Sequence, residues 1–330
     1  MYSFFIGIDV SKSKLDVSYC LFDKVIYLGE FPNSTVGFTS IIMELKSKVN
    51  YELSHWFFCF ENTGVYSKGL VSWLHSYDLA FREENPIQIH KSLGLKRGKD
   101  DRADSKAICR YAFEKRDTIQ ASVVSKPLIV SIKKLVLRRD LLIRQKTAIQ
   151  KSYGAQKQVL DEHLLTLFES QTAQLVNLLE KQIAELEQEI KMCISNDNQL
   201  NNNNELAQSV IGIGPIISAF MIAYTNNFSS FKESRKFASY IGVAPFPNSS
   251  GEYRGKTKVS QLANKKIKSL FSNAAFSAIR HDPQIANYYA KKLSEGKPKA
   301  IIINAIKNKL IHRIYAVIKR GTPYVKFQYI

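Results

Sequence analysis

Cysteine is scarce in this chain of 330 residues, which contains Cys20, Cys59, Cys109 and Cys193. Because no two of them form a CxxC pair, the sequence supports neither a structural zinc site nor a disulfide framework. Apolar runs of the roughly 20 residues that span a membrane are also lacking, and the N-terminus shows no secretion-signal pattern. We therefore expect a reduced, cytoplasmic setting and no membrane partner.

Negative charge is in short supply. The chain has 29 Asp and Glu against 47 Lys and Arg, which gives a formal net charge of +18 and a pI of about 9.6. Residues 251–330 hold 17 Lys and Arg but only three acids. Such a field favours a polyanion as partner. Since neither terminus carries a basic amphipathic helix with bulky apolar anchors, nucleic acid is favoured over a membrane surface.

The sequence opens with SFFIGIDVSKSKLDVSYC, residues 3–20. Residues 4–9 form an apolar run of strand length that ends on Asp9, and residues 15–20 alternate as a half-buried strand does. Gly7 and Asp9 face the same side of the first strand, so Gly7 is expected to leave open space beside the carboxylate. An acid on the first strand of such a pair is how RNase H-like folds begin. An Asp that caps a turn is the alternative.

A second apolar strand, HWFFCFE at residues 55–61, also ends on a carboxylate, Glu61. The order β-β-β-α-β-α-β-α predicts a mixed sheet covered by helices. We therefore predict an RNase H-like (RuvC-like) α/β domain over residues 1–120. A helical pattern then begins at Asp101 and projects Asp101 and Asp104 on one face of its first turn. An acidic helix start with salt bridges to basic neighbours is an equally compatible interpretation.

Long helical patterns fill residues 121–200 and predict a coiled-coil segment, either a dimerisation helix or a self-packed hairpin. The polar segment DNQLNNNN, residues 197–204, indicates a linker before a basic, mainly helical domain over residues 201–330. The turn IGIGP, residues 211–215, is like the phosphate-contacting turn of helix-hairpin-helix units, or a plain packing turn. Residues 244–260 are predicted to form a loop rich in Pro, Gly and Ser.

Four acids stand out, and the RNase H-like plan brings them together. In such a sheet the ends of the first and fourth strands lie side by side, and a later helix lays its acids against them. Four converging carboxylates cannot all stay ionised without a cation. Two Mg²⁺ ions fit such a site, where they activate the attacking oxygen and stabilise the leaving oxygen of a phosphodiester. The predicted ligands are Asp9, Glu61, Asp101 and Asp104.

Several motifs together resemble the DEDD-type transposases of bacterial insertion sequences, relatives of the Piv invertases that include bridge-RNA-guided recombinases. They are GIDVSK, FENTG, the KxDxxD stretch, a GxGP segment and a GxAPxxxxSG loop. The resemblance covers nearly the whole chain and puts Asp9, Glu61, Asp101 and Asp104 on the four family positions. The family usually carries Thr or Asn where Asp100 stands. Either Asp100 or Asp101 can therefore face the metal, and the spacing to Asp104 favours Asp101.

The resemblance also implies a serine nucleophile that leaves a covalent phosphoserine link to DNA. Ser250 matches its position, with Ser249 as the neighbouring candidate, whereas the residues alone favour a simple flexible turn there. No histidine lies in the loop, which fits activation by metal. The resemblance further implies a dimer that pairs into a tetramer around two DNA duplexes, and a guide RNA. Expected phosphate contacts are Arg254, Lys256, Lys258, Lys265, Lys266 and Lys268.

Three other classes stay open. A RuvC-like junction resolvase shares the acids but hydrolyses DNA and needs no serine. A nucleic-acid-binding protein with a degenerate site needs none of these residues for chemistry. A sugar-kinase or actin-like ATPase also begins with an acid on its first strand, but it needs Gly-rich phosphate and adenosine loops. The chain has 15 glycines and no such loops, which disfavours the ATPase.

Overall fold

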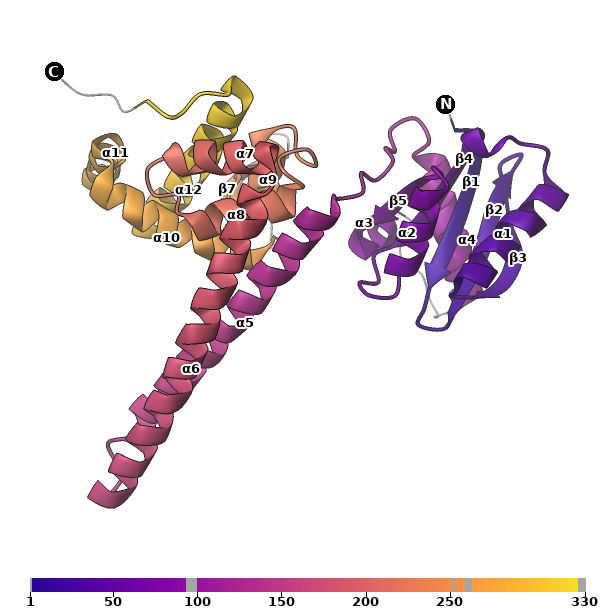
Figure 1. Ribbon diagram of the computed structural model, residues 1–330. Helices are drawn as coiled ribbons and strands as arrows, with labels where there is room; N and C mark the ends of the chain where they lie inside the picture. Colours follow the sequence, from indigo (N-terminus) through magenta and orange to yellow (C-terminus); the bar gives the residue numbers. More distant parts are fainter. Residues whose placement is uncertain (1, 93–99, 251–252, 259–262, 326–330) are drawn as a thin grey trace. The chain divides into compact units, whose positions relative to one another are not determined.

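The computed structural model describes residues 2–92, 100–250, 253–258 and 263–325. The chain divides into two compact units, Met1–Val124 and Ser125–Ile330 (Figure 1). No helix of the described residues is long and apolar enough to cross a membrane.

The first unit is built on a five-stranded mixed sheet in the order β3-β2-β1-β4-β5. Its strands are β1 (Phe4–Val10), β2 (Lys14–Leu21), β3 (Lys24–Pro32), β4 (Trp56–Glu61) and β5 (Ala80–Glu84). Its helices are α1 (Thr35–Lys48), the short η1 (Leu53–His55), α2 (Lys68–Ser76), α3 (Pro86–Ser92) and α4 (Asp101–Glu114). β1 pairs antiparallel with β2 and parallel with β4, so the C-terminal ends of β1 and β4 are neighbours. The predicted mixed sheet covered by helices is confirmed.

The alternation of side chains along β1 divides the core of this unit into two layers. Phe4, Ile6 and Ile8 pack with the buried faces of α1 and α2 on one side of the sheet. Phe5 packs on the other side with α4, which contributes Ile108 among other residues. Figure 1 shows α1 and α2 in front of the sheet and α4 behind it. Because the period of a strand is two, Asp9 belongs to the α4 side.

Gly7 is the position where α4 approaches the sheet most closely. A Cβ atom at Gly7 would lie 2.2 Å from the backbone nitrogen of Cys109 and 2.5 Å from the carbonyl oxygen of Ser105. The expectation of open space beside Asp9 was therefore wrong, because the backbone of α4 fills it. The hydroxyls of Ser18 and Ser105 lie 2.8 Å apart and form a buried hydrogen bond across the same contact. Glycine lets this helix settle with its acidic first turn toward Asp9.

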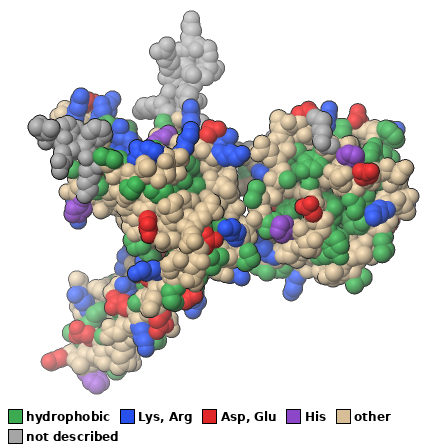
Figure 2. All heavy atoms as spheres, turned by 45° about the horizontal axis from the view of Figure 1, so that its top comes forward, with side chains coloured by type: hydrophobic (Ala, Val, Ile, Leu, Met, Phe, Trp, Pro, Cys, Tyr) green, Lys and Arg blue, Asp and Glu red, His purple; other side chains and the backbone are tan. Residues whose placement is uncertain are grey.

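The second unit begins with a long helical hairpin of α5 (Pro127–Gln156) and α6 (Glu162–Ser195). The two helices pack antiparallel, which is the self-packed alternative for this segment. Ion pairs join Arg139 to Glu187 at 2.6 Å and Lys146 to Glu180 at 3.2 Å. Figure 2 shows Lys and Arg side chains interspersed with Asp and Glu along the hairpin. The base of the hairpin shares one core with the helices that follow.

The Asn-rich segment is helical and is not a linker. It forms most of α7 (Asn198–Ser209), whose first turn is capped by the Asp197 carboxylate, which accepts from the backbone N–H groups of Gln199 and Leu200 at 3.0 Å. Leu200 and Leu206 are buried in the shared core. Burial of these apolar anchors outweighs the low helix propensity of the asparagines between them.

The remaining elements complete a mainly helical body. They are α8 (Pro215–Thr225), α9 (Ser234–Tyr240), β6 (Phe246–Ser250), β7 (Tyr253–Lys258), α10 (Lys265–His281), α11 (Pro283–Ser294) and α12 (Lys299–Arg320). The Gly-rich turn before α8 packs on α10. Gly212 has a φ of +94°, and a Cβ there would lie 2.6 Å from the carbonyl oxygen of Ala274. This contact favours the packing interpretation of that turn.

Candidate active site

Asp9 and Glu61 lie at neighbouring strand ends on the same face of the sheet. The parallel register pairs Ile8 with Phe60, and the two acids are the next residues on β1 and β4. The antiparallel register places Asp16 of β2 directly opposite Asp9. The sheet itself therefore brings three carboxylates to one edge of the face that α4 covers.

The first turn of α4 adds two more carboxylates, and the structure separates the roles of its three adjacent acids. The Asp100 side chain is the helix cap and accepts from the backbone N–H of Arg102 at 3.1 Å. Asp101 and Asp104 follow in the first turn, and Asp101 contacts the ammonium of Lys14 at 3.1 Å. Because Asp100 is committed to capping, the geometry favours Asp101 and Asp104 as the pair that α4 presents.

The pKa of Asp9 reflects its burial and the acids around it. The pKa of Asp9 is raised from 3.8 to about 6, with burial as the largest cause. The other causes are all carboxylates: Asp104, Asp101, Glu61 and Asp16, in descending order. Like charges disfavour the ionised form of their neighbour. Burial and the charges of these four acids thus act together on Asp9.

The donor set suits a hard divalent cation in kind, since carboxylate oxygens are the ligands that Mg²⁺ prefers. As the side chains stand, however, the described part of the chain holds no group of three or more His, Cys, Asp or Glu residues able to hold one metal ion. Lys14 offsets part of the charge instead, 3.1 Å from Asp101, 2.9 Å from Glu30 and 3.5 Å from Asp16. A metal ion bound here would compete with Lys14 for Asp101.

Asp16 and Lys14 are functional candidates that sequence reasoning missed. Asp16 is buried, and the Tyr27 hydroxyl donates a 2.7 Å hydrogen bond to it. The sequence did contain a signal for Asp16. It is an acid at an inward-facing position of β2, the strand that follows the one carrying Asp9. Asp16 is a further acid opposite Asp9, and its carboxylate also contacts the ammonium of Lys14.

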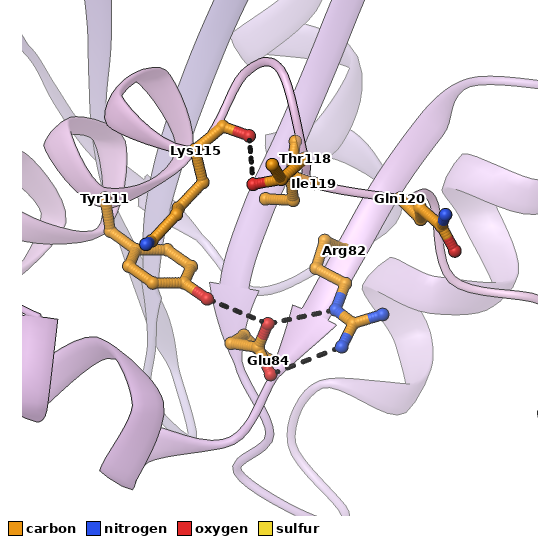
Figure 3. Close-up of a pocket in the computed structure, with 7 residues that line it drawn as sticks. All are labelled: Arg82, Glu84, Tyr111, Lys115, Thr118, Ile119 and Gln120. Atoms are coloured by element: carbon orange, nitrogen blue, oxygen red, sulfur yellow. Dashed lines mark hydrogen bonds and ion pairs between the residues drawn. The ribbon is translucent and has the colours of Figure 1, made fainter. Parts of the chain in front are cut away.

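A second network anchors the far half of α4 (Figure 3). Glu84 ends β5 and pairs in register with Glu61. The Tyr111 hydroxyl donates to Glu84 at 3.1 Å, and Nε of Arg82 donates to the same carboxylate at 3.1 Å. These residues line a cavity of about 210 Å³. The contact ties the helix that carries Asp101 to the strand beside Glu61.

The predicted nucleophile belongs to the second unit. Its segment, expected as a loop, forms an antiparallel two-stranded sheet, in which Ser250 pairs with Tyr253 and Ser249 with Arg254. The side chains of Ser249, Ser250, Arg254, Lys256 and Lys258 lie outside the described part of the structure. Their predicted roles stay predictions.

The three predicted lysines at the start of α10 have different surroundings. Lys265 is exposed. Lys266 forms an ion pair with Asp140 of α5 and lies 5.8 Å from the ring centre of Phe220, so its charge helps to pack the helices. Lys268 donates to the carbonyl oxygen of Gly242 at 2.8 Å. Of these three side chains, that of Lys265 is the most exposed.

Fold and site together define an α/β protein consistent with the RNase H-like type, with acids gathered at the ends of adjacent strands. Comparison with known families agrees. A model of DEDD-type IS110 transposases matches residues 6–169, and the model "Transposase IS116/IS110/IS902 family" matches residues 204–290. The chain belongs to the IS110 family of insertion-sequence transposases.

Relatives of known name support this assignment. The pilin gene-inverting protein of Moraxella bovis is 26% identical over 98% of both chains. The protein of the same name from Moraxella lacunata is equally similar, at 26% identity over 98% of both chains. A 44.8 kDa protein of insertion element IS116 from Streptomyces clavuligerus is 30% identical over 39% of this chain and 33% of its own length.

Proposed function

We propose that this chain is the recombinase of an insertion sequence and that it cuts and rejoins DNA with a serine nucleophile and a carboxylate tetrad. The observation that carries the proposal is the crowding of acids around Asp9, the arrangement from which Mg²⁺-dependent phosphodiester chemistry is built. Family membership supports the reaction class. The tetrad consists of Asp9, Glu61, Asp101 and Asp104.

The tetrad would hold two Mg²⁺ ions, which supply positive charge to the scissile phosphate when bound. Asp9 and Glu61 come from adjacent central strands, so their backbone positions are rigid. Asp101 and Asp104 come from a helix that Gly7 allows to pack tightly on the same strands. Lys14 keeps the position of Asp101 while no ion is bound.

The serine performs the covalent step. Oγ of Ser250 attacks the scissile phosphorus, so an O–P bond forms while the P–O bond to the leaving DNA strand breaks, and the serine proton passes to solvent. A DNA hydroxyl then attacks the phosphoserine, which restores the phosphodiester and frees Ser250. Arg254, Lys256 and Lys258 follow in the chain and are proposed to contact the DNA phosphates.

The partners are DNA at the element ends and at the target, a guide RNA, and further copies of this chain in a dimer or tetramer. The concentration of 17 Lys and Arg against three acids in residues 251–330 supports a nucleic-acid partner. The guide RNA and the assembly rest on the resemblance to RNA-guided members of the family.

A covalent-adduct assay tests the proposal. Full-length protein is incubated with Mg²⁺, associated RNA and labelled element-end DNA, and denaturing gels followed by peptide mapping detect a protein–DNA link. We expect an adduct on Ser250 that is lost in Ser250→Ala and retained in the matched control Ser249→Ala. Asp9→Asn should lose the adduct while retaining DNA binding.

Two results would contradict the mechanism. Unchanged DNA cutting by Ser250→Ala indicates hydrolysis, as in a RuvC-like junction resolvase, the alternative that shares the acids. An adduct mapped to another residue moves the nucleophile elsewhere.

A further inference from the structure

Lys307 of α12 is a nearly buried cation. It is 8% exposed, and no other described lysine is as deeply buried. Among the described residues it has no hydrogen-bond or ion-pair partner, whereas buried charges in proteins are normally paired. Its ammonium nitrogen is not fully buried and lies at the end of a buried stem.

A second ammonium, that of Lys268, comes from α10, which packs against α12. Burial, and then the charge of Lys268, lower the pKa of Lys307. Lys268 donates to the carbonyl oxygen of Gly242 at 2.8 Å, and this carbonyl is a dipole, not a counter-charge. In contrast, Lys266 on the same helix has the carboxylate of Asp140. The fold therefore pairs Lys266 with an acid. It gives Lys268 and Lys307 no acidic partner among the described residues.

The pair lies next to the segment that leads into β6. Lys268 holds Gly242, and the amide of Asn304 donates to the carbonyl oxygen of Val243 at 2.9 Å. Asn304 and Lys307 are three residues apart on α12 and share a face. β6, which carries Ser250, begins at Phe246. Two helices thus bring fixed donors to the entry of this strand.

We propose that Lys307 and Lys268 form a binding site for one phosphate group of a DNA strand at the entry of β6. Two ammonium groups that have no carboxylate partner among the described residues suit a ligand that brings its own negative charge. A phosphodiester meets this requirement, and its recognition there would hold the strand beside the hairpin that contains Ser250. The inference rests on the proposed function only in taking DNA as the ligand.

The test uses Lys307→Met in the full chain, since methionine keeps the length and apolar character of the buried stem. Affinity for a labelled DNA duplex is measured by anisotropy over a range of salt concentrations. We expect about tenfold weaker binding at low salt and a slope of log K against log salt that is smaller by about one, as for the loss of one phosphate contact. Circular dichroism and thermal unfolding should show a fold at least as stable as the wild type.

Lys319→Met is the matched control, because Lys319 is an exposed lysine near the end of the same helix. It should change binding much less than Lys307→Met. Lys268→Met should weaken binding as well, and the double variant should lose less than the sum of the two, because both lysines contact one phosphate.

Equal effects of Lys307→Met and Lys319→Met would show a diffuse field and overturn the proposal, as would unchanged binding by Lys307→Met. All measurements can be repeated in an Asp9→Asn background, which separates phosphate binding from the covalent chemistry. Failure of the serine mechanism would then leave this test intact.

Discussion

Replacement of Asp9 by Asn is expected to stabilise the metal-free protein although it removes a central site residue. The pKa of Asp9 rises from 3.8 to about 6 in the folded chain. A shift of about two units corresponds to about 3 kcal/mol of unfavourable free energy for the ionised form. Because Asp9 is partly exposed, solvent screening reduces this to about 1–2 kcal/mol.

The sign follows from linkage. The folded state holds the Asp9 proton more tightly than the unfolded state does. The stability that protonated Asp9 contributes is therefore fully present below about pH 4. It is lost as the pH rises through about 6. Asn carries no charge at any of these pH values. The advantage of Asp9→Asn over the wild type should therefore be absent near pH 4 and complete near pH 7.5.

Tryptophan fluorescence during urea unfolding measures the effect, because both tryptophans, Trp56 and Trp73, lie in the first unit. At pH 7.5 and without divalent ions, Asp9→Asn should unfold with a free energy about 1–2 kcal/mol higher than the wild type. Added Mg²⁺ should stabilise the wild type and not the variant. Asp117→Asn, at an exposed acid, is the control and should change little. A variant less stable than the wild type at pH 7.5 would refute the crowding of acids.

Two further predictions concern the same unit. Gly7→Ala should cost about 3 kcal/mol or more, because its Cβ would lie 2.2 Å from the backbone of α4, whereas Gly69→Ala, whose nearest neighbour is a ring carbon at 3.8 Å, should be tolerated or stabilising. Urea unfolding checks both, and equal effects would contradict the close approach of helix and strand. Lys14→Met should lower the melting temperature of the metal-free protein and tighten Mg²⁺ binding measured by calorimetry, since Lys14 is a cation within the acidic site. Unchanged Mg²⁺ affinity would show that Lys14 does not compete with the ion.

Much of the first unit follows from local patterns in the sequence. The apolar runs of residues 4–9 and 55–61, each followed by a carboxylate at its end, predicted strands that carry acids, because short continuous apolar runs are typical of buried strands. Strand order then determined that Asp9 and Glu61 are neighbours. The helical spacing of Asp101 and Asp104 likewise depends only on local geometry.

The spacing to Asp104 favoured Asp101 over Asp100 as a ligand, and the local capping bond that Asp100 accepts from Arg102 agrees with this choice. Tertiary contacts decided the rest. The Asn-rich segment became a helix because its leucines reached a core formed by distant residues.

By itself, then, the sequence determined the strands, the helix turn and the acids that they carry, since each depends on neighbours a few residues away. Only the tertiary structure decided that Gly7 leaves room for the backbone of α4, that Asp16 stands opposite Asp9, and that Lys268 and Lys307 come from helices that pack together. Burial and charge proximity depend on segments far apart in the chain, and no local pattern encodes them.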